Sequence, residues 1–395
     1  MKKFDRITPN GTGDLVFLEC NARYTLIEKL RHLFSNFGYG EVRTPTIEFF
    51  DTFSNGIGRL SQNSLYTLTD SAGRLLVMRP DTTKPIARLY ASRLYNNILP
   101  LRIYYTQPVF RRNIELCKKS DEFEQSGIEL IGSNSFKADV EALTLAINSM
   151  YSIFANDFYL EIGHMGLLKP ILLSINDDEL RREVKIAIVN KNYPDLIRLS
   201  ELLGDKGRIL REIPALFGSS NVLEYAEKIF TSKSDCKILT NLKSLCKIAS
   251  HHISQDNIIV DLAIMHEYDY YTGLVFSGYV KGEGSEILSG GRYDSLYSDY
   301  KLNIPAIGFA INIDRATKAY LKSNQYKPSV NLTAVLYSDP ESDNTIITNT
   351  LIHEGYIVVN SLLDSKADAI KYARSLDADL FVFSENNKFV RQKLK

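Results

Sequence analysis

Hydrophobic residues in the first part of the chain recur at steps of three and four positions. Between residues 14 and 37 these positions include Ile27, Leu30, Phe34 and Phe37. This spacing places them on one face of an amphipathic helix, and the glycines at 38 and 40 end it. The next stretch, EVRTPTIEFFD, contains a proline. Because proline lacks a backbone donor, it favours the edge of a sheet or an interface.

Short segments rich in β-branched and aromatic residues follow, and they predict strands. They are residues 102–110, 123–131 and 158–162, with a helix-like run at 137–154 before the third. Strands and helices do not alternate regularly, as they would in a parallel doubly wound fold. The pattern therefore predicts an α+β fold in which an antiparallel sheet is flanked by helices.

The pattern changes at residues 166–254, where helix-like segments are separated by glycine or proline. Because strand-like segments return afterwards, we interpret this part as a helical insertion within a core of residues 1–325. A polar stretch, NQYKPS, then forms a linker, and strands and helices alternate in residues 326–395. This alternation predicts a small C-terminal α/β domain with parallel-sheet character.

The composition is that of an ordinary globular protein, with 395 residues of which 44% are hydrophobic. The 47 basic residues (Lys and Arg) are balanced by 47 acidic residues (Asp and Glu). No overall positive field therefore favours binding of a polyanion such as tRNA. No apolar run approaches the roughly 20 residues of a membrane span, and the N-terminus lacks a signal-peptide core. We therefore expect a cytoplasmic protein without membrane contact.

The four cysteines have neither a Cys-x-x-Cys spacing nor a histidine at metal-ligand spacing. They are Cys20, Cys117, Cys236 and Cys246. We therefore expect no zinc site, no disulfide framework and no bound cofactor.

The first polar cluster that could bind a ligand is Asp81-Thr82-Thr83, which follows a strand-like LLV and a proline. A carboxylate and hydroxyls at such a turn can hold an ammonium group through charge-assisted hydrogen bonds. The alternative is a helix N-cap, in which Asp81 or Thr82 accepts from free backbone N–H groups. The residues of this cluster leave both interpretations open.

Two further clusters carry polar or aromatic side chains. Gln125, Gly127 and Glu129 share one face of a predicted strand, because side chains alternate along strands. The glycine leaves room for a ligand on the sheet, and the alternative is a solvated face with a salt bridge. Tyr270 and Tyr271 form either an apolar wall with hydroxyl tips or core aromatics beside a turn.

Two arginines stand beside predicted strands. Arg111 follows one strand, and Arg315 begins a helix after GFAINI, where it could stack on a base or clamp a phosphate. A surface arginine in the first helical turn is the alternative. The glycine-rich segments at 282–285 and 289–294 are weak as phosphate loops, because the Walker spacing is missing.

In this order and context, the segments resemble the class II aminoacyl-tRNA synthetase core, and specifically that of histidyl-tRNA synthetase. The resemblance covers roughly residues 5–320. FGYGEVRTPTIEFFD resembles motif 1, the dimer-forming segment; PVFRRNIELCKKSDEFEQSGIELIG resembles motif 2; and GFAINIDR resembles motif 3. MRPDTT, YDYYTG and SGGRYDSL resemble elements specific to the histidine enzyme.

Position by position, the resemblance implies a pocket for histidine. Asp81, Thr83 and Gln125 would hold its α-amino group. Glu129 and Tyr271 would hold its imidazole, which offers one donor and one acceptor when neutral. The histidine-binding residues implied in this way are Asp81, Thr83, Arg111, Gln125, Glu129, Tyr270 and Tyr271.

The nucleotide half of the pocket departs from the synthetase pattern. Arg111 and Arg315 remain as residual nucleotide-site positions. However, Asn113 replaces an expected acidic residue, His266 replaces an expected arginine, and Asn312 lies in motif 3 where glycine is expected. Amino-acid activation needs fixed cations where charge develops on the α-phosphate. The C-terminal domain also resembles a shortened anticodon-binding domain.

These departures resemble the regulatory subunit of the short-form ATP phosphoribosyltransferase, a paralogue of histidyl-tRNA synthetase. The resemblance implies a non-catalytic subunit that a short catalytic subunit requires for activity. It also implies feedback inhibition by histidine in the first step of histidine biosynthesis, and a homodimer core within a hetero-oligomer that binds no tRNA. The alternatives are a histidine–tRNA ligase with divergent motifs and a stand-alone amino-acid-binding paralogue with another partner.

Overall fold

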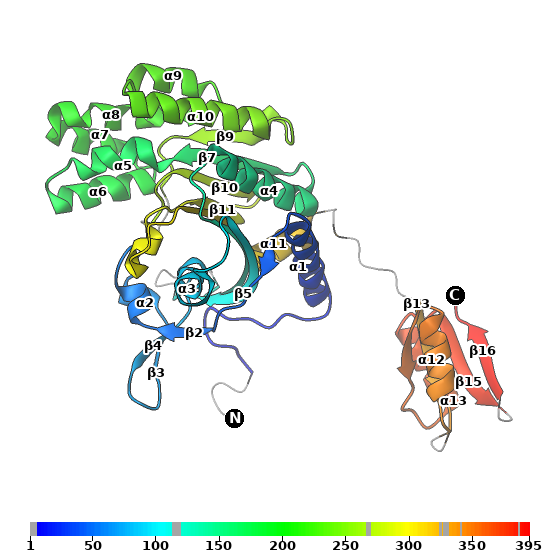
Figure 1. The fold of residues 1–395 in the computed structure, drawn as a ribbon. Helices are drawn as coiled ribbons and strands as arrows, with labels where there is room; N and C mark the ends of the chain where they lie inside the picture. Colours follow the sequence, from blue (N-terminus) through cyan, green and yellow to red (C-terminus); the bar gives the residue numbers. More distant parts are fainter. Residues whose placement is uncertain are drawn as a thin grey trace. The chain divides into compact units, whose positions relative to one another are not determined.

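The computed structural model describes residues 6–112, 120–265, 270–323, 326, 332–339, 342–385 and 388–395. It divides into two compact units, Met1–Tyr326 and Lys327–Lys395. Figure 1 shows the helices and strands of both units. Among the helices described, none has both the length and the apolar character needed to cross a membrane.

A nine-stranded sheet forms the centre of the first unit. In spatial order its strands are β1 (Gly40–Glu41), β5 (Leu101–Phe110), β6 (Glu122–Ile131), β12 (Ala306–Asn312), β11 (Leu288–Arg292), β10 (Leu274–Val280), β7 (Phe158–His164), β9 (Ile258–Asp261) and β8 (Phe217–Gly218). Two neighbouring pairs are parallel, β1 with β5 and β7 with β9, and the other pairs are antiparallel. The predicted α+β class is therefore confirmed, with parallel pairs toward the two ends of the sheet.

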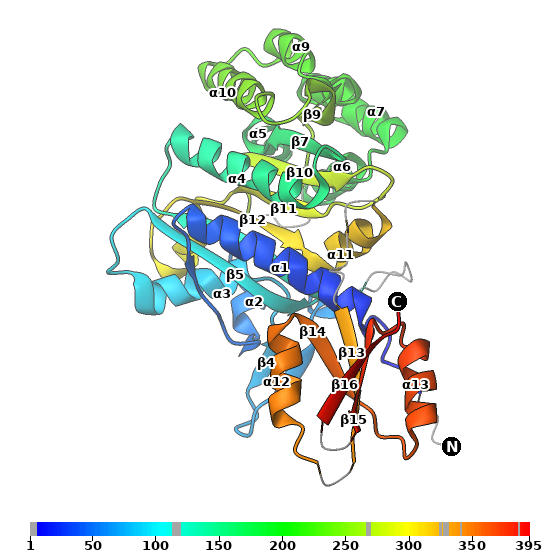
Figure 2. The ribbon, with the colours of Figure 1, turned by 90° about the vertical axis from the view of Figure 1, so that its right-hand side faces the viewer.

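Three helices cover one face of this sheet, and Figure 2 shows two of them, α1 and α4, in front of the strands. They are α1 (Leu18–Asn36), α4 (Phe136–Phe154) and α11 (Ile313–Lys322). The buried residues of α1 recur every four positions from Ala22 to Phe34, so the amphipathic helix is confirmed. Phe37, which the pattern placed on the same face, follows the helix and is 41% exposed. The helix begins at Leu18, a few residues later than the apolar pattern suggested.

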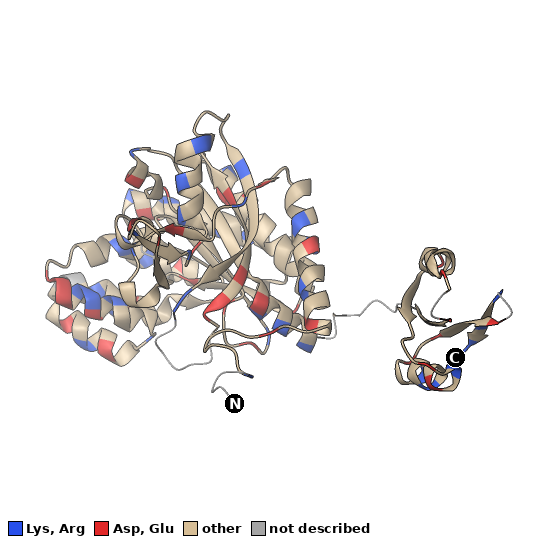
Figure 3. Ribbon diagram, turned by 90° about the horizontal axis from the view of Figure 1, so that it is seen from below, with Lys and Arg blue, Asp and Glu red and all other residues tan. Residues whose placement is uncertain are grey.

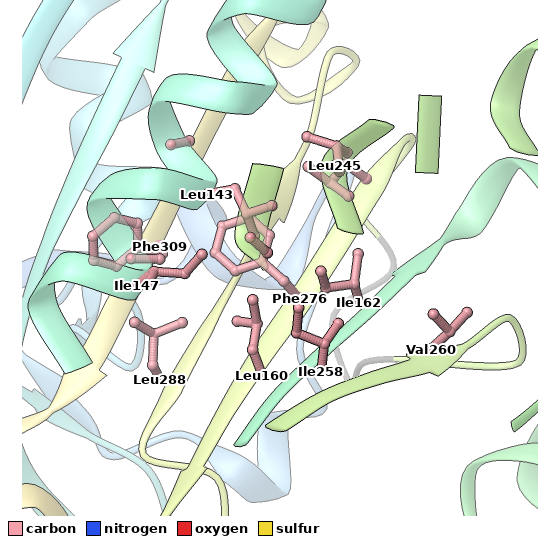
Figure 4. Packing of buried hydrophobic residues seen from close by; sticks show 14 of the residues in the cluster. Leu143, Ile147, Leu160, Ile162, Leu245, Ile258, Val260, Phe276, Leu288 and Phe309 are labelled. Carbon is pink, nitrogen blue, oxygen red and sulfur yellow. The ribbon is translucent and has the colours of Figure 1, made fainter. Parts of the chain in front are cut away.

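The hydrophobic core between α4 and the sheet extends into the helical insertion (Figure 4). Leu143 and Ile147 of α4 pack in one cluster with Phe276 of β10. Leu245, which lies on the insertion helix α10 (Lys233–Ala249), and Ile258 of β9 belong to the same cluster. The insertion and the sheet therefore share one core.

The insertion consists mainly of helices. Basic and acidic residues are interspersed along the ribbon of the chain (Figure 3). Before α10 its helices are α5 (Met165–Leu173), α6 (Asp178–Val189), α7 (Tyr193–Leu202), α8 (Arg208–Glu212) and α9 (Val222–Ile229). Lys191, in the turn between α6 and α7, places its Nζ atom 3.0 Å from Asp261 and 3.6 Å from Glu161. Both carboxylates are buried in the large sheet. An ion pair thus ties the insertion to the sheet.

A second, three-stranded sheet lies next to the short helix α2 (Asp51–Ser54). Its order is β2 (Ile47–Phe49), β4 (Leu75–Met78) and β3 (Thr67–Thr69). The proline-containing segment EVRTPTIEFFD supplies edge strands to both sheets, β1 and β2, as its sequence predicted. The outward side chains of β2, Ile47 and Phe49, are 45% and 50% exposed.

The second unit is a small α/β structure with a four-stranded sheet. Its strands, in spatial order, are β14 (Tyr356–Asn360), β13 (Leu332–Tyr337), β15 (Leu380–Glu385) and β16 (Lys388–Lys393). The first three are parallel, as expected, while β16 pairs antiparallel with β15. One helix packs on each face, α12 (Thr345–His353) on one and α13 (Lys366–Ser375) on the other.

Candidate functional site

A cavity of about 390 Å³ opens on the face of the large sheet opposite α1 and α4, beside the helix α3 (Thr83–Leu89; Figure 1). Its volume lies within the range of roughly 300–1,000 Å³ that is usual for small-molecule sites. All seven residues that the sequence predicted for histidine binding line it, and so does Arg315. Residues separated by more than 200 positions in the chain thus meet around one cavity.

The turn before α3 presents a buried carboxylate to this cavity. Asp81 is 5% exposed, and one of its carboxylate oxygens accepts a hydrogen bond from the backbone N–H of Lys84 at 3.2 Å. Burial raises the pKa of Asp81, and the positive charge of Arg111 acts in the opposite direction. The two interpretations of this cluster are therefore compatible, because Asp81 caps the helix while it also lines the cavity.

Glu129 lies on β6 at the floor of the cavity and is 2% exposed. Its carboxylate accepts hydrogen bonds from the Thr83 hydroxyl at 2.9 Å and from the Tyr293 hydroxyl. Burial raises the pKa of Glu129 to about 8, although both hydroxyl donors favour the charged form. Gly308 faces it on β12, and a Cβ there would collide with the carboxylate. A glycine at position 308 therefore leaves the space that the Glu129 carboxylate occupies.

The raised pKa of Glu129 gives a testable dependence of stability on pH. The folded protein holds the proton that the unfolded chain releases near pH 4.5, so folding is stabilised at low pH. This contribution falls as the pH rises toward 8, by up to about 1.4 kcal/mol per pH unit. We expect Glu129→Gln, which cannot titrate, to become more stable relative to the wild type between pH 5 and pH 8.

Urea unfolding of both proteins at the two pH values measures this difference. Buried acids whose raised pKa does not depend on Glu129, such as Glu161, titrate in both proteins and cancel. A stability difference that does not change with pH would show that Glu129 is ionised throughout.

Three tyrosines form the wall above Glu129. The ring centroids of Tyr270 and Tyr271 are 4.8 Å apart, and those of Tyr270 and Tyr293 are 5.7 Å apart. Burial raises the pKa of Tyr271, so its hydroxyl remains protonated at neutral pH. Gly291 makes room for this wall, because a Cβ there would lie 2.8 Å from the Tyr271 ring.

Gln125 and Gly127 of β6 have different surroundings from those that the sequence suggested. The amide oxygen of Gln125 accepts a hydrogen bond from the Thr82 hydroxyl at 3.3 Å. The space beside Gly127 was expected to admit a ligand, and this prediction is wrong. The Phe309 carbonyl oxygen and the Tyr105 hydroxyl already occupy it. Gly127 is needed for the close approach of neighbouring strands.

Two arginines also line the cavity. Arg111 donates from Nε to the Pro80 carbonyl oxygen at 2.8 Å, and its guanidinium lies 5.3 Å from the centre of the Phe123 ring. Arg315 donates to the Glu286 carbonyl oxygen at 2.9 Å, and burial lowers its pKa. Both side chains are therefore partly engaged by the protein itself.

Of the three departures from the synthetase motifs, Asn312 is described by the structure. Its side-chain oxygen accepts from the backbone N–H of Arg315 at 2.9 Å and caps α11. The side chain also lines the cavity. Asn113 and His266 lie outside the described residues.

Sequence reasoning missed three tyrosines of the cavity, Tyr105, Tyr279 and Tyr293. Tyr293 stands in SGGRYDSL and could have been found from that motif. Tyr105 lies directly opposite Gly127 in the β5–β6 register, and only the strand pairing reveals it. Among the described residues, no group of three or more His, Cys, Asp or Glu side chains is placed to hold a metal ion.

Comparisons with known proteins place the chain in a family. A family model described as histidyl-tRNA synthetase matches residues 11–316. A Clostridium novyi protein named ATP phosphoribosyltransferase regulatory subunit is 34% identical over 99% of this chain and 95% of its own length. Proteins of the same name from Clostridium acetobutylicum (37% identical, 81% of this chain and 80% of theirs) and Bacillus cereus (33%, 99% and 94%) are also similar.

Solved structures agree with this assignment. A Bacillus halodurans structure named ATP phosphoribosyltransferase regulatory subunit/histidyl-tRNA synthetase superposes with a TM-score of 0.81 at 26% identity, covering 97% of this chain and 99% of that one. Histidyl-tRNA synthetase from Nostoc has the same fold, with a TM-score of 0.76 at 18% identity and coverage of 99% and 97%. The expected synthetase-like fold is confirmed. The chain therefore belongs to the family of ATP phosphoribosyltransferase regulatory subunits, whose fold is that of the class II histidyl-tRNA synthetases.

Proposed function

We propose that a short ATP phosphoribosyltransferase catalytic subunit requires this chain for activity, and that histidine bound to this chain inhibits that enzyme. The step concerned is the first in histidine biosynthesis. The names of the relatives support the regulatory role. The observation that carries the histidine-sensing part is the cavity that buried Asp81 and Glu129 both line, together with hydroxyl and amide groups.

The two ends of a histidine molecule match the two acids. Asp81 would accept from the α-ammonium group, and the Thr83 hydroxyl and the Gln125 amide oxygen lie nearby in the same cavity. Glu129 and Tyr271 would pair with the two nitrogens of the imidazole, since one group accepts and the other can donate or accept. Arg111 would face the carboxylate of the amino acid. Tyr293, which already donates to Glu129, would orient it.

We propose that this chain does not itself activate amino acids. Adenylate formation needs guanidinium groups that remain available to the α-phosphate. Arg111 donates to the Pro80 carbonyl oxygen, and Arg315 donates to the Glu286 carbonyl oxygen. Asn312 in motif 3 serves as a helix cap beside the same cavity. The side chains of Arg111, Arg315 and Asn312 thus already form hydrogen bonds within the protein.

We also propose that two copies associate through the outer face of the three-stranded sheet. That face consists of Ile47, Phe49, Leu68, Leu76 and Met78, which the strand register places on the same side. All five are apolar, and Ile47 and Phe49 are about half exposed. A contiguous apolar face on a soluble unit is typical of an interface. The segment that supplies Ile47 and Phe49 is also the one that resembles the dimer-forming motif 1.

Reconstitution with a short catalytic subunit from the same organism tests this proposal. We expect the rate of phosphoribosyl transfer to rise at least about tenfold when this chain is added, and to fall again with histidine. The variant Asp81→Asn should still activate, because Asp81 lies inside the cavity, but should need about tenfold more histidine to inhibit. Full activity of the catalytic subunit alone, or indifference to histidine, would contradict the proposal.

A histidine–tRNA ligase is the second candidate, because Arg111 and Arg315 line the same cavity as the predicted amino-acid site. Histidine-dependent exchange of pyrophosphate into ATP separates the two functions. We expect only background exchange from this chain. Robust exchange that disappears in Arg111→Ala would favour the ligase.

A further inference from the structure

Arg79 immediately precedes the turn that carries Asp81 and Thr83, and its side chain points away from the cavity into the protein. It is 1% exposed. Its Nε atom donates to the Pro108 carbonyl oxygen, and one terminal nitrogen donates to the carbonyl oxygens of Thr44 and Pro45, each at 2.8 Å. The same nitrogen reaches the Thr44 hydroxyl at 3.2 Å. One side chain thus joins three separate segments.

The charge of Arg79 is held mainly by neutral oxygen atoms. Burial lowers its pKa to about 10, and the negative charge of Glu48 acts in the opposite direction. Glu48 itself forms an ion pair with Arg88 at 2.6 Å. A buried guanidinium is costly unless its hydrogen bonds are well satisfied. Its position is therefore set by the carbonyl groups of residues 44, 45 and 108.

On one side, these bonds control the segment that leads into β2. The backbone N–H of Arg79 donates to the Thr46 carbonyl oxygen at 2.9 Å. Gln107 adds to this grip, because its amide group hydrogen-bonds both the backbone N–H and the hydroxyl of Thr44. Ile47 follows Thr46 directly in the chain and is the first residue of the outer face of the three-stranded sheet.

On the other side, Arg79 borders the ligand turn directly. Its carbonyl oxygen accepts from the backbone N–H of Phe110, at the end of β5. The next carbonyl, that of Pro80, accepts from Arg111. Asp81 and Thr83 follow within four residues, and both line the cavity. A ligand that fixes this turn therefore also fixes the backbone that carries Arg79.

We infer that Arg79 is a positioning residue that couples occupation of the histidine pocket to association of two copies through the outer face of the three-stranded sheet. This inference rests on the proposed function. Bound histidine would fix the position of the turn. The hydrogen bonds of the Arg79 guanidinium would then fix Thr44 and Pro45, and with them the start of β2. Coupling of this kind is reciprocal, so histidine tightens the dimer and the dimer tightens histidine binding.

Sedimentation of the full chain over a range of concentrations, with and without saturating histidine, tests the coupling. For the wild type we expect histidine to lower the dimer dissociation constant at least about fivefold. In Arg79→Lys the effect should fall below about twofold, because a single ammonium cannot span the Pro108 and Thr44 carbonyls that the guanidinium fork reaches. The matched control is Arg102→Lys, on the β5 strand that also carries Pro108.

Arg102 donates through Nε and a terminal nitrogen to Glu141, at 2.7 and 2.8 Å, so its substitution should keep the wild-type response. If Arg79→Lys fails to fold, as judged by circular dichroism, Thr44→Val removes only the hydroxyl that bonds Arg79 and Gln107 and should also weaken the response. Calorimetry of the wild type separates the two proposals. Histidine binding with an unchanged dimer would overturn this inference alone, whereas no histidine binding would overturn the proposed function and this inference together.

Discussion

Replacing Glu129 by alanine is expected to weaken histidine binding about a hundredfold, equivalent to about 2.7 kcal/mol. The substitution removes the buried carboxylate that would accept from the imidazole, so a donor of the ligand is left unsatisfied in a site that water hardly reaches. It also leaves the hydroxyls of Thr83 and Tyr293 without their common acceptor. Isothermal titration calorimetry with histidine measures the effect.

One control variant and one further measurement define this result. Glu141→Gln alters a partly buried acid that pairs with Arg102 and is not among the described residues that line the cavity, so it should leave the affinity for histidine within about twofold. Glu129→Ala should also remain associated, because Glu129 lies far from the outer face of the three-stranded sheet in the sequence and on another sheet. Unchanged calorimetric affinity in Glu129→Ala would refute the imidazole assignment.

Replacing Gly127 by alanine is expected to destabilise the fold by about 3 kcal/mol. The new Cβ would overlap the Phe309 carbonyl oxygen and lie 2.9 Å from the Tyr105 hydroxyl. Phe309 lies on β12 and pairs with residues of β11 and β6 on its two sides. Its carbonyl group therefore cannot move without disturbing the hydrogen bonds between these strands. Urea unfolding should show a lower midpoint with a similar slope.

Gly284 provides the matched control for this substitution. A Cβ at Gly284 has no heavy atom within 4 Å, and Gly284→Ala should change stability by less than about 0.5 kcal/mol. Equal midpoints for Gly127→Ala and the wild type would mean that β6 and β12 can separate at this point without cost.

Local patterns predicted much of the fold because the central elements are long and strongly patterned. β5, β6 and α4 appear close to the residues that their composition indicated. In contrast, β16 was not anticipated. Its sequence, KFVRQK, is exposed throughout and lacks a regular hydrophobic alternation. This strand forms because the edge of β15 is available for pairing. Such an edge is a property of the folded sheet, so the local sequence of a charged segment does not indicate it.

Part of the cavity could likewise be predicted from the sequence, and part could not. The resemblance to synthetase motifs selected seven residues that the fold brings together, although it could not give their partners. The pairing of Glu129 with Tyr293 depends on two strands meeting through β12, and the position of Tyr105 depends on register. Asn312 was identified only as a departure from motif 3, and its role as a helix cap becomes visible only when the start of α11 is known.

The ion pair of Lys191 with Asp261 and Glu161 bears on how this architecture could have been assembled. An inserted segment that is a true cassette can be excised, leaving a core that closes over the gap. Here excision would leave two buried acids without their cation and would strip Leu245 from the core that Ile258 shares. The helices at 166–254 thus form part of the core, and we expect a chain trimmed of them to be destabilised.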